Sequence, residues 1–309
     1  MAALPEISAK WSKPRDLTGE NVLITGASGG LGLAAAKQIA EHGGNLILAV
    51  RNVRKASALA KQLSIASRGS IDVIELDLSD LKSVHSAAEQ VKNEIDILIL
   101  NAGVMATPLR HTVDGFELQM GTNHLGHFAF SGLLQNKLKD GARVVSVASQ
   151  AHRLAQFPAA KIMDICRGVG EYQPWQAYAR SKVSNLLFIN ELQRRNSKSK
   201  KVIAVSAHPG WSATNLQMVG PQMRNQLMMA RGSALFNSAF AQSADKGALP
   251  ILCAATLIDL PGGSYLGPNG FLEMRGYPKY TRASSTAYDQ GLAQSLWQIS
   301  EELTGVTWK

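Results

Sequence analysis

The chain has few of the residues that define several large classes of protein. It contains two cysteines, Cys166 and Cys253, in 309 residues, which excludes a disulfide scaffold and a cysteine-rich zinc module. Charged residues make up only 18% and hydrophobic residues 45%, which is typical of a globular protein and not of a disordered chain. No apolar run reaches the roughly 18 residues of a membrane helix, and residues 1–19 lack an apolar signal region. We therefore expect a cytoplasmic protein without a transmembrane anchor.

Positive charge is the one pronounced bias of the composition. Lysine and arginine number 32 against 23 acidic residues, a net charge of +9. Such a balance can favour nucleic acid, a lipid surface or a phosphorylated cofactor as partner. The densest basic cluster, residues 194–201, falls where a helix is expected to end, and cations suit that end of the helix dipole. We expect a small-molecule partner and no nucleic acid.

Short apolar runs alternate with longer amphipathic stretches along the chain. The runs are nearly continuous in hydrophobic residues, which is typical of parallel strands buried on both faces. This predicts an α/β fold, a doubly wound Rossmann-type parallel sheet in a single domain over residues 1–309, with an insertion at about 215–241. The expected strands are 21–25, 45–50, 71–76, 96–100, 143–148, 202–207 and 264–266, and the expected helices are 30–42, 53–66, 79–91 (capped by Ser79), 113–138, 175–195 and 244–257.

A glycine-rich turn joins the first expected strand to the first expected helix. Gly26, Gly30 and Gly32 lie where an open α/β sheet binds a dinucleotide, and a helix N-terminus offers free N–H groups to its phosphates. The same turn also matches the Gly-x-Ser-x-Gly elbow of hydrolases through Ser28. The His-Gly-Gly-Gly oxyanion motif occurs nowhere in the chain, so we interpret Ser28 as a phosphate ligand.

The end of the second expected strand bears on the choice of cofactor. An acidic residue there binds the ribose 2′-hydroxyl of NAD, but this strand runs into Arg51 and Asn52. The guanidinium of Arg51 suits a phosphate group. The sequence therefore favours NADP(H) over NAD(H).

A tyrosine and a lysine, Tyr178 and Lys182, are four residues apart on an expected helix and so share one of its faces. A nearby ammonium is expected to lower the pKa of a phenol and to suit it to acid–base work. Ser149 follows the fifth expected strand, at the sheet edge where such folds bind ligands. These three residues are the predicted catalytic group.

Taken together, these motifs resemble the short-chain dehydrogenase/reductase superfamily. The resemblance is carried from residue 21 to 214 by Thr25-Gly26-x-x-x-Gly30-x-Gly32, Asn101-Ala102-Gly103, Ser149 and Tyr178-x-x-x-Lys182. Residues 123–128 (Asn-His-Leu-Gly-His-Phe) and 208–210 (His-Pro-Gly) are similar to its retinol-dehydrogenase-like branch. Two positions depart from the superfamily pattern, Leu100 for an asparagine and Ala148 for a serine, and neither removes a catalytic group.

The resemblance implies a role for each matching residue. Tyr178 would be the general acid/base, Lys182 would bind the nicotinamide ribose, and Ser149 would hold the reacting oxygen. Asn123 would complete the catalytic set by shaping its helix and anchoring a proton-relay water. With Tyr178 and Lys182, the cofactor would contact Gly26, Ser28, Gly30, Leu31, Gly32, Arg51, Asn52, Asp77, Leu78, Asn101, Ala102, Gly103, Pro209, Gly210 and Thr214.

The predicted function is an NADP(H)-dependent oxidoreductase that moves a hydride between nicotinamide and a carbonyl or alcohol. The resemblance implies that the insertion at about 215–241 is a lid over the substrate. Its methionines between residues 218 and 229 are flexible and polarizable and favour a lipophilic substrate. Two alternatives on the same fold stay open: a non-catalytic NADP(H)-sensing protein, and an epimerase or dehydratase. His124 and His127 are interpreted as packing residues and not as metal ligands, because no third ligand accompanies them. Relatives often assemble through helix packing, so a homo-oligomer is a further hypothesis.

Overall fold

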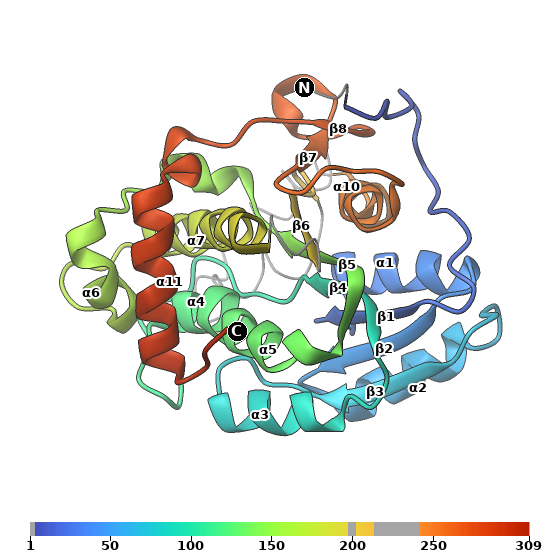
Figure 1. Cartoon of the computed structure of the whole chain (residues 1–309), viewed down its shortest axis with the longest axis horizontal. Helices are drawn as coiled ribbons and strands as arrows, with labels where there is room; N and C mark the ends of the chain where they lie inside the picture. Colours follow the sequence, from blue (N-terminus) through green and yellow to red (C-terminus); the bar gives the residue numbers. More distant parts are fainter. Residues whose placement is uncertain (1–3, 197–201, 213–241, 309) are drawn as a thin grey trace, which may run out of the picture.

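The computed structural model describes residues 4–196, 202–212 and 242–308. An eight-stranded sheet in the order β3-β2-β1-β4-β5-β6-β7-β8 forms its centre (Figure 1). All neighbouring strands are parallel except β7 and β8. The strands are β1 (Asn21–Thr25), β2 (Asn45–Val50), β3 (Ile71–Glu75), β4 (Ile95–Leu100), β5 (Leu138–Val147), β6 (Val202–Ala207), β7 (Tyr265–Pro268) and β8 (Pro278–Tyr280).

Helices cover both faces of the sheet (Figure 1). On one face lie α1 (Gly30–Glu41), α2 (Val53–Leu63) and α10 (Ala244–Thr256), and on the other lie α3 (Leu81–Gln90), α5 (Gly126–Leu133) and α7 (Pro174–Asn196). Alternate residues of one strand serve the two layers: Val22 and Ile24 pack in the first core and Leu23 in the second. This is why the strands read as continuous apolar runs. The predicted fold class is confirmed.

A layer outside α7, which the sequence analysis did not predict, comes from the connection between β5 and α7 and from the C-terminal part. Helices α6 (Ile162–Arg167) and α11 (Gln290–Thr304) belong to it. Phe128 of α5 and Phe188 of α7 pack against Trp297 of α11 and Trp308. The aromatic contacts close this side of the core, and the antiparallel strand β8 closes the sheet edge.

The prediction of one helix over residues 113–138 is wrong. Gly115 has a φ of 80°, and a turn at this position ends any earlier helical path. The Glu117 carboxylate caps the following helix by accepting from two backbone N–H groups, so α4 (Leu118–Met120) begins there, continues as a π-helical turn, η1 (Gly121–Leu125), and joins α5. Leu138 already belongs to β5, five residues before the expected start of that strand.

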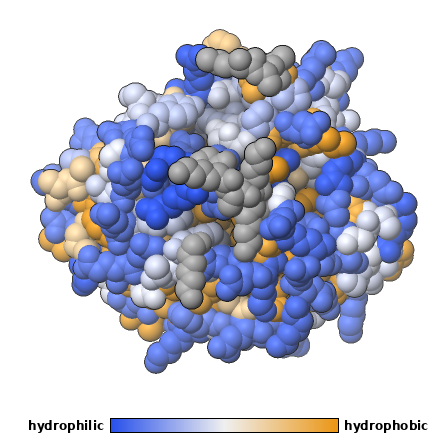
Figure 2. Space-filling view, viewed as in Figure 1, coloured by the Kyte–Doolittle hydropathy of each residue, from blue (hydrophilic) through white to orange (hydrophobic). Residues whose placement is uncertain are grey.

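Helix α3 is capped by Asp80 and not by Ser79. The Asp80 carboxylate accepts from the N–H of Lys82. The Ser79 hydroxyl is engaged elsewhere, because it donates to the Asp77 carboxylate. Among the described residues, no helix is both long and apolar enough to cross a bilayer. The expected lid at 215–241 lies outside the described residues. Figure 2 shows a mostly hydrophilic face on which the apolar side chains form only small groups.

Candidate active site

A cavity of about 1290 Å³ lies at the carboxyl ends of β1, β2, β4, β5 and β6. In an open α/β sheet this edge binds ligands, because the strand order reverses there and leaves a crevice. The cavity brings together most of the residues that the sequence analysis selected: Gly26, Ser28, Gly30, Leu31, Gly32, Arg51, Asp77, Leu78, Asn101, Ala102, Gly103, Ser149, Tyr178, Lys182, Pro209 and Gly210. Asn52 and Asn123 do not line it, and Thr214 lies outside the described residues.

The turn between β1 and α1 is packed so closely that two of its glycines have no room for a side chain. Gly26 has a φ of 72°, and a Cβ there would lie 2.8 Å from the Cα of Ala102. A Cβ on Gly32 would lie 2.6 Å from the Gly26 carbonyl oxygen. Glycine is therefore required at both positions. The first amides of α1 have no acceptor inside the helix and lie at the cavity, as an anion site needs.

Thr25 ties this turn to the end of β4. Its hydroxyl oxygen accepts from the N–H groups of Asn101 and Ala102, both at 3.0 Å, and the Asn101 amide donates to the Thr25 carbonyl. His127 lies behind, with Nε2 2.9 Å from the Thr25 hydroxyl and Nδ1 3.0 Å from the Asn123 carbonyl. Burial lowers the pKa of His127 to about 4, so the ring is neutral, with Nδ1 donating to that carbonyl and Nε2 accepting from Thr25.

Neither histidine of this helix is arranged as a metal ligand. Both ring nitrogens of His127 are bonded within the protein, and Nε2 of His124 lies 2.9 Å from the Ser300 hydroxyl. In the part of the chain that the structure describes, no cluster of three or more His, Cys, Asp or Glu could hold a metal ion.

The end of β2 brings two cations to the cavity, Arg51 and Lys55. The sequence analysis selected Arg51 but missed Lys55, which lies one helical turn into α2. Its position four residues after Arg51 is the feature of the sequence from which it could have been predicted. Asn52 has a different role from the one predicted: its side chain caps α2 by accepting from the Lys55 N–H at 2.9 Å. It thereby orients the helix that carries Lys55.

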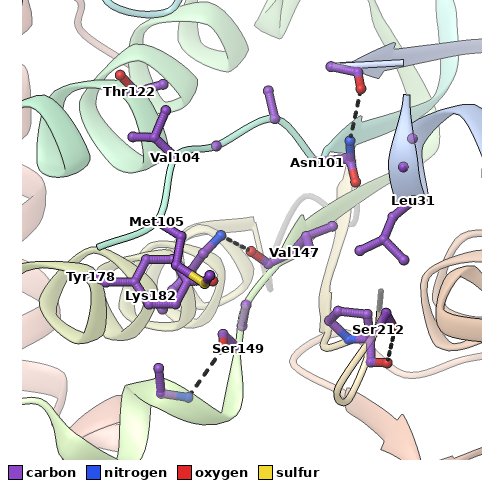
Figure 3. A pocket seen from close by; sticks show the side chains of 18 of the residues that line it. Leu31, Asn101, Val104, Met105, Thr122, Val147, Ser149, Tyr178, Lys182 and Ser212 are labelled. Carbon is purple, nitrogen blue, oxygen red and sulfur yellow. Dashed lines mark hydrogen bonds between the residues drawn. The ribbon is translucent and has the colours of Figure 1, made fainter. Parts of the chain in front are cut away.

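Ser149, Tyr178 and Lys182 meet on one wall of the cavity (Figure 3). Tyr178 and Lys182 are 4% and 3% exposed, and the Lys182 ammonium lies 5.8 Å from the centre of the Tyr178 ring. Lys182 donates to the Val147 carbonyl at 2.9 Å, which fixes it beside the end of β5. The Ser149 hydroxyl accepts from the Ala151 N–H at 3.2 Å. The predicted face of the helix is thus the face that meets the sheet edge.

The expectation that the pKa of Tyr178 is lowered is wrong. Burial raises the pKa of Tyr178 to about 12, against a smaller lowering effect of its hydrogen bond with the Ser149 side chain. Burial also lowers the pKa of Lys182 to about 8. Desolvation disfavours the charged form of each group. Near neutral pH the phenol is protonated and can donate a proton.

Asn123 lies behind the cavity, in the π-helical turn η1. Its side-chain oxygen accepts from the Val104 N–H at 2.8 Å, and its amide donates to the Val104 carbonyl and to the Ser181 hydroxyl, both at 2.9 Å. Ser181 in turn donates to the Tyr178 carbonyl. Asn123 therefore links the loop that follows β4, at Val104, to the helix of Tyr178.

The far end of the cavity is built by residues that the sequence analysis did not select. They come from the loops after β4 and β5, the start of α7, the segment after β6 and the connection between β7 and β8: Met105, Gln150, Arg153, Leu154, Trp175, Trp211, Leu272, Glu273, Met274 and Lys279. His208 is fully buried, and its Nδ1 accepts from the Gly210 N–H at 3.2 Å. No local pattern marks these residues.

Comparison with known proteins agrees with this geometry. A family model described as short chain dehydrogenase matches residues 20–225. Retinol dehydrogenase 11 from Homo sapiens is 36% identical over 297 residues, covering 94% of this chain and 87% of the relative.

The chain belongs to the short-chain dehydrogenase/reductase family.

Within this family of oxidoreductases, the chain belongs to the retinol-dehydrogenase-like branch. A crystal structure of an uncharacterized protein from Mycobacterium Paratuberculosis shares 40% identity and a TM-score of 0.80, covering 97% of this chain and 99% of that one. The structure of a blue fluorescent protein from a metagenomic library, in complex with NADPH, shares the fold at 21% identity and a TM-score of 0.61. It covers 81% of this chain and 96% of that one.

Proposed function

We propose that the protein is an NADP(H)-dependent oxidoreductase that interconverts a lipophilic carbonyl and its alcohol. The observation that carries this proposal is a single cavity with two chemically different ends. One end has the glycine turn and two cations, and the other has a tyrosine, a lysine and a serine on one wall. Family membership supports the same reaction class.

The residues at the first end fit a dinucleotide. Gly26 and Gly32 leave a cradle in which an added Cβ would collide with backbone, and the amides that begin α1 suit a pyrophosphate. Asp77 and Leu78 line the cavity after β3 and would face the adenine. Arg51 and Lys55 would hold a 2′-phosphate, which supports NADP(H) over NAD(H).

Each residue of the second end has a definable task. The bound nicotinamide would supply or accept the hydride. Tyr178, protonated near neutral pH, would give its proton to the oxygen of a carbonyl that is being reduced. Ser149 would donate a hydrogen bond to the same oxygen, and Lys182 would bind the ribose hydroxyls. Asn123 would act on the site indirectly, by joining the loop after β4 to α7, the helix that carries Tyr178 and Lys182.

Apolar side chains around the second end favour a lipophilic substrate. Leu154, Trp175 and Leu272 line the cavity and stay 66%, 48% and 70% exposed, so they have surface to offer a hydrocarbon group. Burying that surface against a substrate is favourable at about 25 cal/mol per Å². The name of the human relative, retinol dehydrogenase 11, points in the same direction.

NADPH binding and NADPH oxidation separate this proposal from its main alternative. We expect the protein to quench or shift NADPH fluorescence and to oxidise NADPH with at least one of retinal, a steroid ketone, a quinone or a medium-chain aldehyde. Tight NADPH binding without turnover across such a panel would favour a cofactor-sensing protein. Absence of NADPH binding would contradict the proposal as a whole.

A further inference from the structure

A partly buried carboxylate, Glu273, lies where three separate loops of the cavity meet. It belongs to the connection between β7 and β8, and its oxygens accept from Gln150 after β5, from His208 after β6, and from Thr281 after β8. Lys279 adds an ion pair at 3.4 Å. A single side chain thus joins the ends of β5 and β6 to the last part of the sheet.

The tautomer of His208 lets its ring donate a hydrogen bond to the Glu273 carboxylate. Nδ1 of His208 lies 3.2 Å from the Gly210 N–H and therefore accepts, which leaves the proton on Nε2 to be donated to Glu273 at 3.2 Å. Burial lowers the pKa of His208, so the ring is neutral, and its hydrogen bond lowers the pKa of Glu273 to about 2. An ionised carboxylate with several donors makes the strong class of hydrogen bond.

The backbone around Glu273 is held in a conformation that it would not adopt by itself. Leu272 and Glu273 both have positive φ, 49° and 55°, which is unfavourable for residues with a Cβ. Such residues persist where the surroundings over-determine them. The Trp211 N–H donates to the Met274 carbonyl at 2.7 Å, and a Cβ on Gly210 would lie 2.4 Å from that same oxygen. The segment after β6 and the β7–β8 connection are therefore tightly apposed.

We infer that Glu273 is a positioning residue that clamps the β7–β8 connection onto the loops after β5 and β6. The clamp fixes Leu272 and Met274 as one wall of the cavity and orients Gln150, the neighbour of Ser149. The clamp acts on turnover by holding this wall in place. This inference rests on the proposed function only for its effect on turnover. The clamp itself is a property of the chain.

The test compares Glu273→Gln with Glu41→Gln. The second variant makes the same chemical change in an exposed pair with Lys37 on α1. Hydrogen–deuterium exchange needs no substrate. In Glu273→Gln we expect at least about tenfold faster exchange for amides in 206–212 and 266–282, because local opening becomes easier, and unchanged exchange in 21–50. Exchange equal to that of wild type and Glu41→Gln in every peptide would overturn the clamp.

Turnover supplies the second measurement. With the best carbonyl of the panel, Glu273→Gln should raise KM about tenfold or more, since a charged hydrogen-bonded anchor is lost. The Kd for NADPH should stay within about twofold, because the cofactor cradle is built from other residues. An unchanged KM would refute the effect on the substrate wall. If Glu273→Gln fails to fold, Thr281→Val removes one donor and should show the same pattern more weakly. Should wild type itself fail to bind NADPH, the proposed function falls, while the exchange result still decides the clamp.

Discussion

The two ends of the cavity are built in different ways. At the cofactor end the contacts involve the backbone of strands that are neighbours in the sheet: the Gly26 N–H donates to the Ala49 carbonyl at 2.8 Å, and the Thr25 hydroxyl accepts from two successive backbone amides. At the substrate end the contacts are between side chains from distant parts of the chain, such as Gln150 and Glu273, which are 123 positions apart. The first kind of site requires particular glycines in a fixed order. The second requires only that complementary side chains meet.

The two ends should also fail independently, and Tyr178→Phe is the strongest test. Loss of the proton donor should lower turnover by about a thousandfold or more, within the usual range for general acid–base catalysis. The Kd for NADPH should barely change, because the cradle is untouched. Steady-state rates and fluorescence titration measure the two effects. Tyr288→Phe, at a 52% exposed tyrosine, is the control, and wild-type turnover by Tyr178→Phe would contradict the proposed role.

The pH dependence of turnover should separate the two ends further, because the proton donor, Tyr178, lies at the substrate end. Alcohol oxidation needs the phenolate, and with a pKa of about 12 for Tyr178 its fraction rises about tenfold per pH unit. Between pH 6 and 8, below the pKa of about 8 of Lys182, kcat/KM for oxidation should therefore rise steeply. Carbonyl reduction uses the protonated phenol and should stay nearly flat. Equal slopes in both directions would show that another group titrates.

A pair of glycine substitutions tests whether the cofactor end depends on backbone geometry. Gly19 and Gly26 both have positive φ, but a Cβ on Gly19 meets nothing within 4 Å, whereas one on Gly26 meets Ala102 at 2.8 Å. Gly19→Ala should cost about 1 kcal/mol of unfolding free energy from backbone strain alone. Gly26→Ala should cost roughly 2–4 kcal/mol and should weaken NADPH binding. Denaturant unfolding and titration measure both, and equal losses would refute the close-approach argument.

Arg51→Ala should give the smallest effect and the most selective one. We expect NADPH affinity to fall about tenfold, as for a lost charged hydrogen bond, with NADH affinity nearly unchanged. Lys61→Ala, in the last turn of α2, controls for the loss of one positive charge. If NADPH and NADH affinities fell equally, the 2′-phosphate assignment would fail.

Local patterns predicted the strands and the cofactor end well, for physical reasons. The bounds of β1, β2 and β6 are as expected because buried parallel strands are continuous apolar runs that end at polar or turn residues. The segment 113–138 misled the prediction because its apolar residues suit a helix throughout. The positive φ at Gly115 and the capping by Glu117 divide it instead.

Within the candidate site, the sequence predicted which chemical groups are present but not the environment of each group. Tyr178 and Lys182 share the predicted face, yet burial raises the pKa of one and lowers the pKa of the other, which no spacing indicates. Asn123 and Asn52 were chosen as site residues and are positioning groups outside the cavity. Lys55 could have been found from its distance to Arg51.

The order and spacing of residues along the chain determined the sheet, the glycine turn and the pair of catalytic candidates, because these depend on backbone conformation and helical periodicity. Only the tertiary structure decided which side chains form the substrate end and what charge each buried group carries. Both depend on contacts between loops that follow different strands, and on the water excluded when those loops pack together.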